Sequence, residues 1–275
     1  MVGDVEGVAA TSLMTAAAGA RESARSDRLF DDPWAELLGG DEGRAFLARQ
    51  DEVLPPPPTP VFVVRHRFFD DFLLAQASRG IRQVVLLAAG LDTRAYRLEW
   101  PAGVRVFELD QPEVLSYKQS VLDGYGASPT CERVVVPTDL REDWAAKLLA
   151  SGYDRSQAAV WLAEGLLFYL PEEAVRGLLD TTARLSVPGS VLGTDTMSAV
   201  MLASEQRRPW VDLFRDSGAP FVFGTDDPAE LIGSHGWVPT IYSSRAVAES
   251  LGRAWPSPAG SALPPGSIIT ATRST

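Results

Sequence analysis

A turn of small residues after an apolar run is the first feature of this sequence that could hold a ligand. The stretch VVLLAAGLDTRAYRL, Val84–Leu98, predicts a buried strand, a tight turn and then a polar helix. A dinucleotide site needs two more glycines after the first, for pyrophosphate approach and for helix packing. Here Leu91, Asp92 and Thr93 follow Gly90, and Asp92 would place negative charge where the pyrophosphate should lie. The turn therefore argues against NAD.

Acidic residues after the next two predicted strands favour a nucleoside that carries no phosphates. Asp110 ends the second strand 20 residues after Gly90, the spacing of a carboxylate that accepts hydrogen bonds from ribose hydroxyls. Glu108 lies on the same face of that strand and is the alternative for this role. After the third strand, Asp139 and Leu140 could flank an adenine ring, with the carboxylate accepting from the exocyclic amine. Helix capping is the competing interpretation for both aspartates.

Alternating strand and helix patterns predict a doubly wound α/β sheet. Five short apolar runs indicate parallel strands covered on both faces: Gln83–Ala89, Val104–Asp110, Glu132–Pro137, Ala158–Ala163 and Ser190–Asp195. Helical segments between them are predicted at Pro112–Tyr125, Arg141–Ala150 and Pro171–Leu185. Two weaker strands, Val238–Ser243 and Ser267–Thr272, are expected to form an antiparallel edge.

The remaining segments are predicted to cap one end of the sheet within a single domain, residues 1–275. The N-terminal segment, residues 1–80, has a helical pattern and is interrupted at Asp51–Pro60 by a stiff, proline-rich connector. An insertion at about residues 197–236 separates the fifth strand from the last two. Neither segment is long enough for a domain of its own, so both are expected to belong to the cap.

Charge and composition exclude several classes of partner. The formal net charge of −11 argues against nucleic acid and against an anionic membrane. Cys131 is the only cysteine, and His66 and His235 are the only histidines, which disfavours a metal site and excludes an internal disulfide. No secretory pattern or membrane-spanning run is present. We therefore expect a cytoplasmic protein with a small-molecule partner; the oligomeric state is not set by the sequence.

Several motifs, in order along the chain, resemble those of one enzyme family. They are TSLMTAAAGARESARSDRLFDDPWAELL and VVRHRFFDDFLL, the turn VVLLAAGLDTRAYRL, and then FELDQPEVLSYKQSVL, TDL, AEGLLFYLPEE and DDPAELIGSHGW. From about Thr11 to Trp237 the chain resembles the S-adenosylmethionine-dependent methyltransferases of the leucine carboxyl methyltransferase type, in their bacterial branch with natural-product or uncharacterised substrates. The resemblance implies the class I methyltransferase (Rossmann-like) fold: a mostly parallel seven-stranded sheet with helices on both faces, one antiparallel edge strand and a helical cap.

The resemblance also implies which residues bind the cofactor, S-adenosyl-L-methionine. Arg65 would pair with the methionyl carboxylate, and Glu164 would lie near the same end of the cofactor. Gly90 would lie under the cofactor and Asp110 would bind the ribose. The pair Asp139-Leu140 would contact the adenine.

Two positions depart from the family pattern. The turn reads Ala-Ala-Gly where the family usually has Gly-Ala-Gly, so Ala88 adds a methyl group beside the cofactor path. The N-terminal helix has Gly19 where many relatives carry a basic residue, and Arg21 is the nearest substitute. Both departures bear on cofactor affinity more than on the fold.

Other side chains have competing roles. Arg94 either pairs with Glu108 or contacts ligand. Tyr169 is a candidate for contact with the methyl acceptor, the alternative being aromatic packing. His66 and His235 are more simply structural or exposed, although His235 is the histidine of the cap region and so a further candidate at the acceptor.

The sequence thus predicts an S-adenosylmethionine-dependent O-methyltransferase with a small, natural-product-like acceptor, most favourably a carboxylate. A carboxylate is already ionised at neutral pH, so positioning could supply most of the catalysis, and we assign no catalytic residue. A phenol or alcohol would need a base, for which His235 is the candidate. The alternative is a methyltransferase-fold protein that binds the cofactor or a small molecule without methyl transfer. A nicotinamide-dependent oxidoreductase is disfavoured by the turn.

Overall fold

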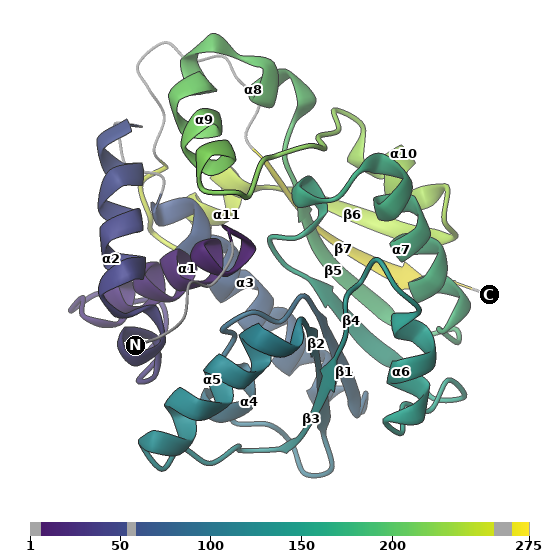
Figure 1. The fold of residues 1–275 in the computed structure, drawn as a ribbon. Helices are drawn as coiled ribbons and strands as arrows, with labels where there is room; N and C mark the ends of the chain where they lie inside the picture. Colours follow the sequence, from purple (N-terminus) through teal and green to yellow (C-terminus); the bar gives the residue numbers. More distant parts are fainter. Residues whose placement is uncertain (1–6, 54–58, 256–265, 275) are drawn as a thin grey trace.

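A seven-stranded sheet forms the centre of the protein. The computed structural model describes residues 7–53, 59–255 and 266–274 (Figure 1). The strand order is β3-β2-β1-β4-β5-β7-β6. The strands are β1 (Gln83–Leu87), β2 (Arg105–Asp110), β3 (Glu132–Pro137), β4 (Ala159–Ala163), β5 (Val191–Thr196), β6 (Trp237–Ser243) and β7 (Ser267–Arg273). All seven predicted strands are confirmed, with ends that differ by at most two residues.

The antiparallel strand lies inside the sheet rather than at its edge. The strands from β3 to β5 are parallel, and β7 runs antiparallel to both β5 and β6. The last two strands do pair antiparallel, as predicted, but the expected antiparallel edge strand is wrong in position because β6 is the edge. The side chains explain this order. Ile268 and Ile269 of β7 are buried, whereas β6 exposes Val238 and carries Pro239, whose missing N–H is tolerated at an edge.

Both faces of the sheet are covered by helices, because successive strand residues point to opposite faces. On one face, Val84 and Leu86 pack in a cluster with residues of α3 (Thr59–Ser78), α5 (Pro112–Gly124) and α11 (Ser244–Ser250). On the other face, Val85 and Leu87 pack with residues of α6 (Trp144–Ala150), α7 (Glu172–Arg184) and α10 (Pro228–Gly233). The fold is therefore a three-layer α/β sandwich, as the sequence predicted.

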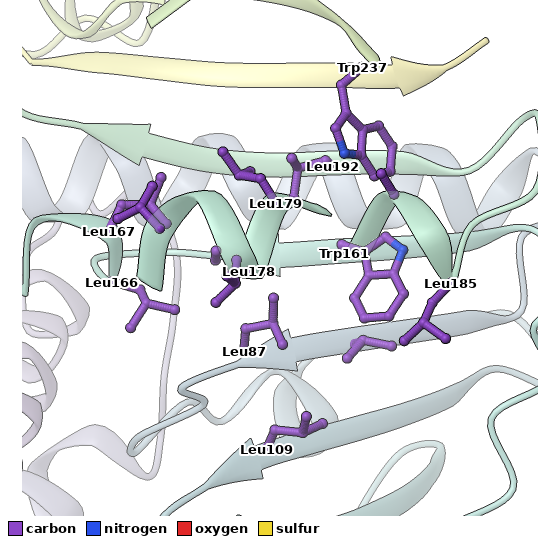
Figure 2. Close-up of a cluster of buried hydrophobic side chains, with 14 of the residues drawn as sticks. Leu87, Leu109, Trp161, Leu166, Leu167, Leu178, Leu179, Leu185, Leu192 and Trp237 are labelled. Carbon is purple, nitrogen blue, oxygen red and sulfur yellow. The ribbon is translucent and has the colours of Figure 1, made fainter. Parts of the chain in front are cut away.

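Helix α7 shows how the second face is built. Its buried residues recur at helical spacing, including Val175, Leu178 and Leu179, so one stripe of the helix faces the sheet. Figure 2 shows Leu178 and Leu179 on the helix that lies over the strands carrying Trp161 and Leu192, and all four belong to one buried cluster. Each fully buried leucine of this kind contributes about 1.5–3 kcal/mol relative to an exposed one.

The remaining helices form the cap and the connections. The N-terminal ones are α1 (Gly7–Ser23) and α2 (Ala35–Val53); the shorter ones are α4 (Arg94–Arg97), η1 (Leu167–Tyr169), α8 (Ala199–Ala203), η2 (Glu205–Arg207) and α9 (Arg208–Asp216). A third apolar cluster, which includes Met14, Phe46, Trp210 and Phe214, joins α1, α2 and α9. Figure 1 shows these three helices on the same side of the molecule. None of the helices in the described ranges has the length and apolar character needed to span a membrane.

Three predicted segments differ in detail from the structure. The predicted connector Asp51–Pro60 is shorter, because α2 extends to Val53 and α3 begins at Thr59; residues 54–58 lie outside the described residues. The helix predicted from Arg141 begins only at Trp144, where Asp143 accepts a hydrogen bond from the Ala146 N–H (3.1 Å) and caps it. The polar helix expected after the first turn is reduced to the four residues of α4.

Close packing of α1 on α2 depends on glycine. A Cβ atom at Gly39 would lie 2.8 Å from the backbone nitrogen of Ala17, and one at Gly43 would lie 2.7 Å from the carbonyl carbon of Leu13. Gly40, between them, has a φ of 54° and kinks α2. These glycines fix the position of α1, which brings its polar residues over the end of the sheet.

We predict that Gly39→Ala lowers the free energy of unfolding by about 1–3 kcal/mol, because the added methyl group collides with backbone that has no rotamer to change. Gly177→Ala is the matched control, since Gly177 lies on an exposed part of α7 with nothing within 4 Å of its added Cβ. It should stabilise by up to about 1 kcal/mol, the helix propensity difference. Urea unfolding measures both. Equal effects of the two substitutions would show that the contact between α1 and α2 is loose.

Candidate cofactor and acceptor site

A large cavity lies at the carboxyl ends of β1, β2 and β4. Its volume is about 960 Å³, and its lining includes residues of α1, α3, α5, η1 and α9. The sheet order reverses between β1 and β4, so the cavity lies at the topological switch point, where ligands of open α/β sheets bind. The cavity has a charged part along the strand ends and an aromatic part under the cap.

The turn after β1 forms the floor of the charged part. Ala88 has a φ of 54°, and it is the one non-glycine residue with positive φ in the described ranges. Gly90 also has positive φ, and its N–H donates to Asp110 Oδ2 at 2.6 Å. A Cβ at Gly90 would lie 3.0 Å from Ser12 Oγ of α1. Because the later glycines of the dinucleotide pattern are absent, the turn is narrow, and α1 covers it at Ser12.

Asp110 lies at the cavity, and Glu108 does not. Asp110 is 8% exposed and accepts hydrogen bonds from the Gly90 and Gln111 N–H groups. Burial raises the pKa of Asp110, and those two backbone donors only partly offset the effect. Glu108 is fully buried under α5, where Lys118 Nζ and Arg133 Nη2 both lie 2.7 Å from it. Of the two candidates for the ribose, the structure brings only Asp110 to the lining.

Asp139 and Leu140 line the far end of the charged part. Asp139 accepts a hydrogen bond from the Arg141 N–H and forms an ion pair with the Arg141 side chain at 2.5 Å, which lowers its pKa. Neither aspartate caps a helix. Asp143 caps α6, and the residue before α5 makes no side-chain cap. The competing explanation for Asp110 and Asp139 is therefore absent from the described hydrogen bonds.

Arg65 and Glu164 meet at the opposite end, together with Asp195, which the sequence analysis did not single out. Arg65 donates from Nε to Glu164 Oε1 (3.1 Å) and from Nη1 to Asp195 Oδ2 (2.8 Å). Asp195 also accepts from the Gly165 N–H at 2.6 Å. Gly165 has positive φ, and a Cβ there would lie 3.0 Å from Arg65 Nη2. The sequence signal that could have revealed Asp195 was its own position, as an acidic residue near the carboxyl end of a predicted strand.

Of the two alternatives for Arg94, the pairing with Glu108 is wrong. Arg94 is fully buried and lies 2.6 Å from Asp70, 2.5 Å from Asp92 and 2.8 Å from Glu164. The two side chains extend in different directions, because Arg94 reaches toward α3 and the end of β4 while Glu108 reaches toward Lys118 of α5. Burial opposes ionisation of Glu164, but Arg94, His66 and Arg65 outweigh it and hold its pKa well below the ordinary value.

The two histidines have different positions. His66 lines the cavity, with Arg94 Nη2 2.9 Å from Nδ1 and Arg97 Nη2 2.7 Å from Nε2. His235 is not part of the lining; its Nδ1 lies 2.6 Å from Asp180 Oδ1 of α7. The structure therefore does not bring His235 to the candidate acceptor site, because the turn before β6 places it beside α7.

The remaining predicted residues lie on the walls. Tyr169 of η1 lines the cavity, and burial raises the pKa of its hydroxyl. Gly19 lines it as well, whereas the Arg21 guanidinium lies 2.5 Å from Asp51 of α2. The sequence analysis did not identify the contribution of α1, which adds the hydroxyls of Thr11, Ser12 and Thr15 to the lining.

The donor set fits S-adenosylmethionine. The turn and Asp110 leave a narrow space that a Cβ at Gly90 would fill and that offers no room for a pyrophosphate. The buried carboxylate of Asp110 lies at the edge of this space. The excess of carboxylates around the cavity suits a ligand with cationic groups.

Comparison with known proteins identifies the family. The leucine carboxyl methyltransferase family matches residues 12–183 of the chain. The chain belongs to this family. It is therefore an S-adenosylmethionine-dependent methyltransferase, and both the resemblance and the cofactor assignment are confirmed.

Similar proteins occur in actinobacteria. A candidate S-adenosyl-L-methionine-dependent methyltransferase of Saccharopolyspora erythraea is 42% identical over 253 residues, which is 85% of this chain and 84% of that protein. One from Mycobacterium bovis is 40% identical over 269 residues, covering 91% and 86% of the two chains.

Solved structures share the fold of this methyltransferase. A candidate methyltransferase from Thermobifida fusca YX superposes with a TM-score of 0.64 at 18% identity, covering 87% of this chain and 92% of the other. A duf574 family protein from Streptomyces avermitilis superposes with the same TM-score of 0.64 at 17% identity, covering 92% of this chain and 98% of the other. These likenesses confirm the class I methyltransferase fold.

We predict that Asp110→Ala weakens binding of S-adenosylhomocysteine at least tenfold. The loss of a charged acceptor for ribose hydroxyls costs roughly 1.5–3 kcal/mol. Asp123→Ala is the control, because Asp123 lies in α5, the helix that follows Asp110, and does not line the cavity. Among the described hydrogen bonds, its side chain accepts one from Gln119. Isothermal calorimetry measures both. Unchanged affinity in Asp110→Ala with the fold intact would remove the ribose role.

We also predict that Ala88→Gly stabilises the protein by up to about 1 kcal/mol, because glycine adopts positive φ without the Cβ strain of alanine. Affinity for S-adenosylhomocysteine should stay equal or rise. Ala89→Gly is the neighbouring control: Ala89 is buried without positive φ, so its loss should destabilise. Thermal unfolding and calorimetry test the pair. If Ala88→Gly abolished binding in a folded protein, the methyl group would be an adaptation to the ligand.

Proposed function

We propose that this enzyme transfers the methyl group to a carboxylate oxygen of a small-molecule acceptor bound in the same cavity. The cavity volume of about 960 Å³ is at the upper end of the roughly 300–1,000 Å³ typical of ligand pockets. A cavity of this size supports the binding of an acceptor beside the cofactor. Arg65 and Glu164 would hold the methionyl end of the cofactor, Asp110 the ribose, and Asp139 with Leu140 the adenine. The acceptor would then lie in the aromatic part.

The observation that carries the proposal is that the nearby titratable groups are either engaged by other side chains of the protein or held in a state that makes them poor bases. His66 Nδ1 lies 2.9 Å from Arg94 Nη2 and 3.4 Å from Glu164 Oε1, and its Nε2 lies 2.7 Å from Arg97 Nη2, so both ring nitrogens are engaged by other side chains of the protein. Glu164 is held ionised by its arginine partners, which makes it a weak proton acceptor. Burial raises the pKa of Tyr169, so its hydroxyl stays protonated and does not serve as a base. An acceptor that needs no base suits this arrangement.

The reaction of a carboxylate suits the surroundings as well. When bound, S-adenosylmethionine supplies an electrophilic methyl group on a sulfonium, and its transfer to a carboxylate leaves a neutral ester and a neutral thioether, so no proton has to move. The aromatic residues exclude water from the acceptor oxygen, which strengthens the attraction between opposite charges. The residues of the cavity would act by positioning the acceptor and by keeping the site dry.

We predict that the enzyme, screened with labelled S-adenosylmethionine against small carboxylic acids and the matching alcohols and phenols, labels the acids as base-labile methyl esters. The single-turnover rate should be flat above the pKa of the acceptor, near 4 for an ordinary carboxyl group. His235→Asn should leave this rate unchanged, because His235 lies beside Asp180 outside the cavity lining. Labelled ethers, formed at a rate that rises through about pH 6–7, would contradict the proposal and point to His66 as a base.

A further inference from the structure

Five aromatic residues form one wall of the cavity, called here the aromatic wall: Phe168, Tyr169, Trp210, Phe214 and Phe221. Phe221 lies at its centre. Its ring centroid is 5.4 Å from that of Tyr169, and 4.6 Å from those of both Trp210 and Phe214. The corresponding interplanar angles are 29°, 32° and 31°, whereas Trp210 and Phe214 are at 61° to each other and Phe168 is at 75° to Phe221. The wall therefore presents both ring faces and ring edges, against which an aromatic group can pack offset-stacked or edge-to-face.

Hydrogen bonds outside the cavity fix the wall in place. The Val222 N–H donates to the Phe168 carbonyl at 2.8 Å, and the Phe223 N–H donates to the same oxygen at 3.3 Å. The segment that carries Phe221 is thereby tied to η1. Trp210 Nε1 donates to Gln50 Oε1 of α2 at 3.3 Å, which sets the plane of the indole. The wall is therefore preorganised, so a ligand that stacks on it need not order these side chains.

The charges of the cavity lie elsewhere. Its described lining residues from α1, η1, α9 and the segment through Phe221 are apolar, aromatic or hydroxyl-bearing and include no charged side chain. The charged lining residues, such as Arg65, Asp110 and Glu164, come from α3, from α5, from the segment between α1 and α2, and from the strand ends with their loops. A molecule on the aromatic wall would therefore place an uncharged body there. Its charged group would have to lie at the border, where the Tyr169 hydroxyl bonds that of Thr11.

We propose that the acceptor is a planar aromatic monocarboxylic acid whose rings stack on the aromatic wall, with its carboxylate at the border beside Thr11 and Tyr169. This inference rests on the proposed function for the identity of the reacting group, while the aromatic class follows from the wall. A peptide C-terminus fits less well, because the amide groups of a peptide would meet apolar rings without hydrogen-bond partners. A cationic ligand fits less well too, since the elements that carry the wall add no carboxylate to the lining that could compensate its charge.

The test is a binding series on the full-length enzyme saturated with S-adenosylhomocysteine, so that no reaction is required. Calorimetry would compare benzoate, 2-naphthoate and anthracene-2-carboxylate with their fully saturated ring analogues, a leucine-terminated tripeptide and 2-naphthyltrimethylammonium. We expect at least one aromatic acid to bind tenfold or more tightly than its saturated analogue and than the tripeptide. Equal affinities, no binding by any aromatic acid, or a preference for the tripeptide or the cation would overturn the inference.

Variants separate stacking from general packing. Phe221→Leu and Trp210→Leu should each weaken binding of the preferred aromatic acid at least fivefold while binding of its saturated analogue changes less than twofold. Phe46→Leu is the matched control, because Phe46 packs on Phe214 at 5.5 Å in the same cluster but does not line the cavity. An equal loss in Phe46→Leu would mean that the wall acts only as core, which contradicts the inference.

The outcomes also distinguish this inference from the proposed function. If the aromatic acids bind selectively but no methyl ester forms with S-adenosylmethionine, the carboxylate reaction fails and the aromatic preference stands. If esters form on saturated acids as readily as on aromatic ones, the reaction stands and the aromatic inference fails.

Discussion

A buried network of ion pairs holds the ligand-binding end of the sheet together. Arg65 of α3 joins Glu164 after β4 to Asp195 of β5, and Arg94 joins Glu164 to Asp70 of α3. Such a network costs desolvation energy that is offset only when its hydrogen bonds are satisfied, and removing one partner typically costs about 3–5 kcal/mol. Burial opposes ionisation of Asp70, but Arg94, His66 and Arg97 lower its pKa to about 2, so this carboxylate stays ionised across the physiological range.

The balance of charge in this network explains what the site can accept. Three guanidinium groups, from Arg65, Arg94 and Arg97, face five carboxylates: Asp32, Asp70, Asp92, Glu164 and Asp195. The excess is negative before Asp110 is considered. A ligand with an ammonium and a sulfonium group compensates this excess, whereas a pyrophosphate would add to it. The same carboxylates that restrain the arginines would therefore also favour a cationic cofactor over a pyrophosphate.

The sequence predicted those parts of the structure that depend on local pattern. The seven strands and the class I fold follow from apolar runs and turns, and Asp110 comes to the cavity because the carboxyl ends of adjacent parallel strands meet at one edge. Ion-pair partners that are set by the tertiary structure could not be predicted from local sequence patterns. Arg94 pairs with Asp70 rather than Glu108, and Asp195 meets Arg65 across 130 positions of sequence. In the aromatic part, Phe168 and Tyr169 belong to the motif AEGLLFYLPEE, but the rings of α9 and of the segment after it belong to none of the motifs named above.

Helix α1 makes the two parts of the cavity mechanically dependent. Its Ser12 closes over Gly90 in the charged part, while Met14 packs in the apolar cluster with Phe46, Trp210 and Phe214 that supports the aromatic wall. Because the glycines of α2 fix α1 at close range, a shift of α1 would alter the ceiling over Gly90 and the packing behind the wall together. A substitution in the cap that adapts the wall to another acceptor is therefore tolerated only if α1 keeps its place. With the acceptor on the wall as proposed, this constraint would link acceptor choice to cofactor binding in addition to the direct contact at the transferred methyl group.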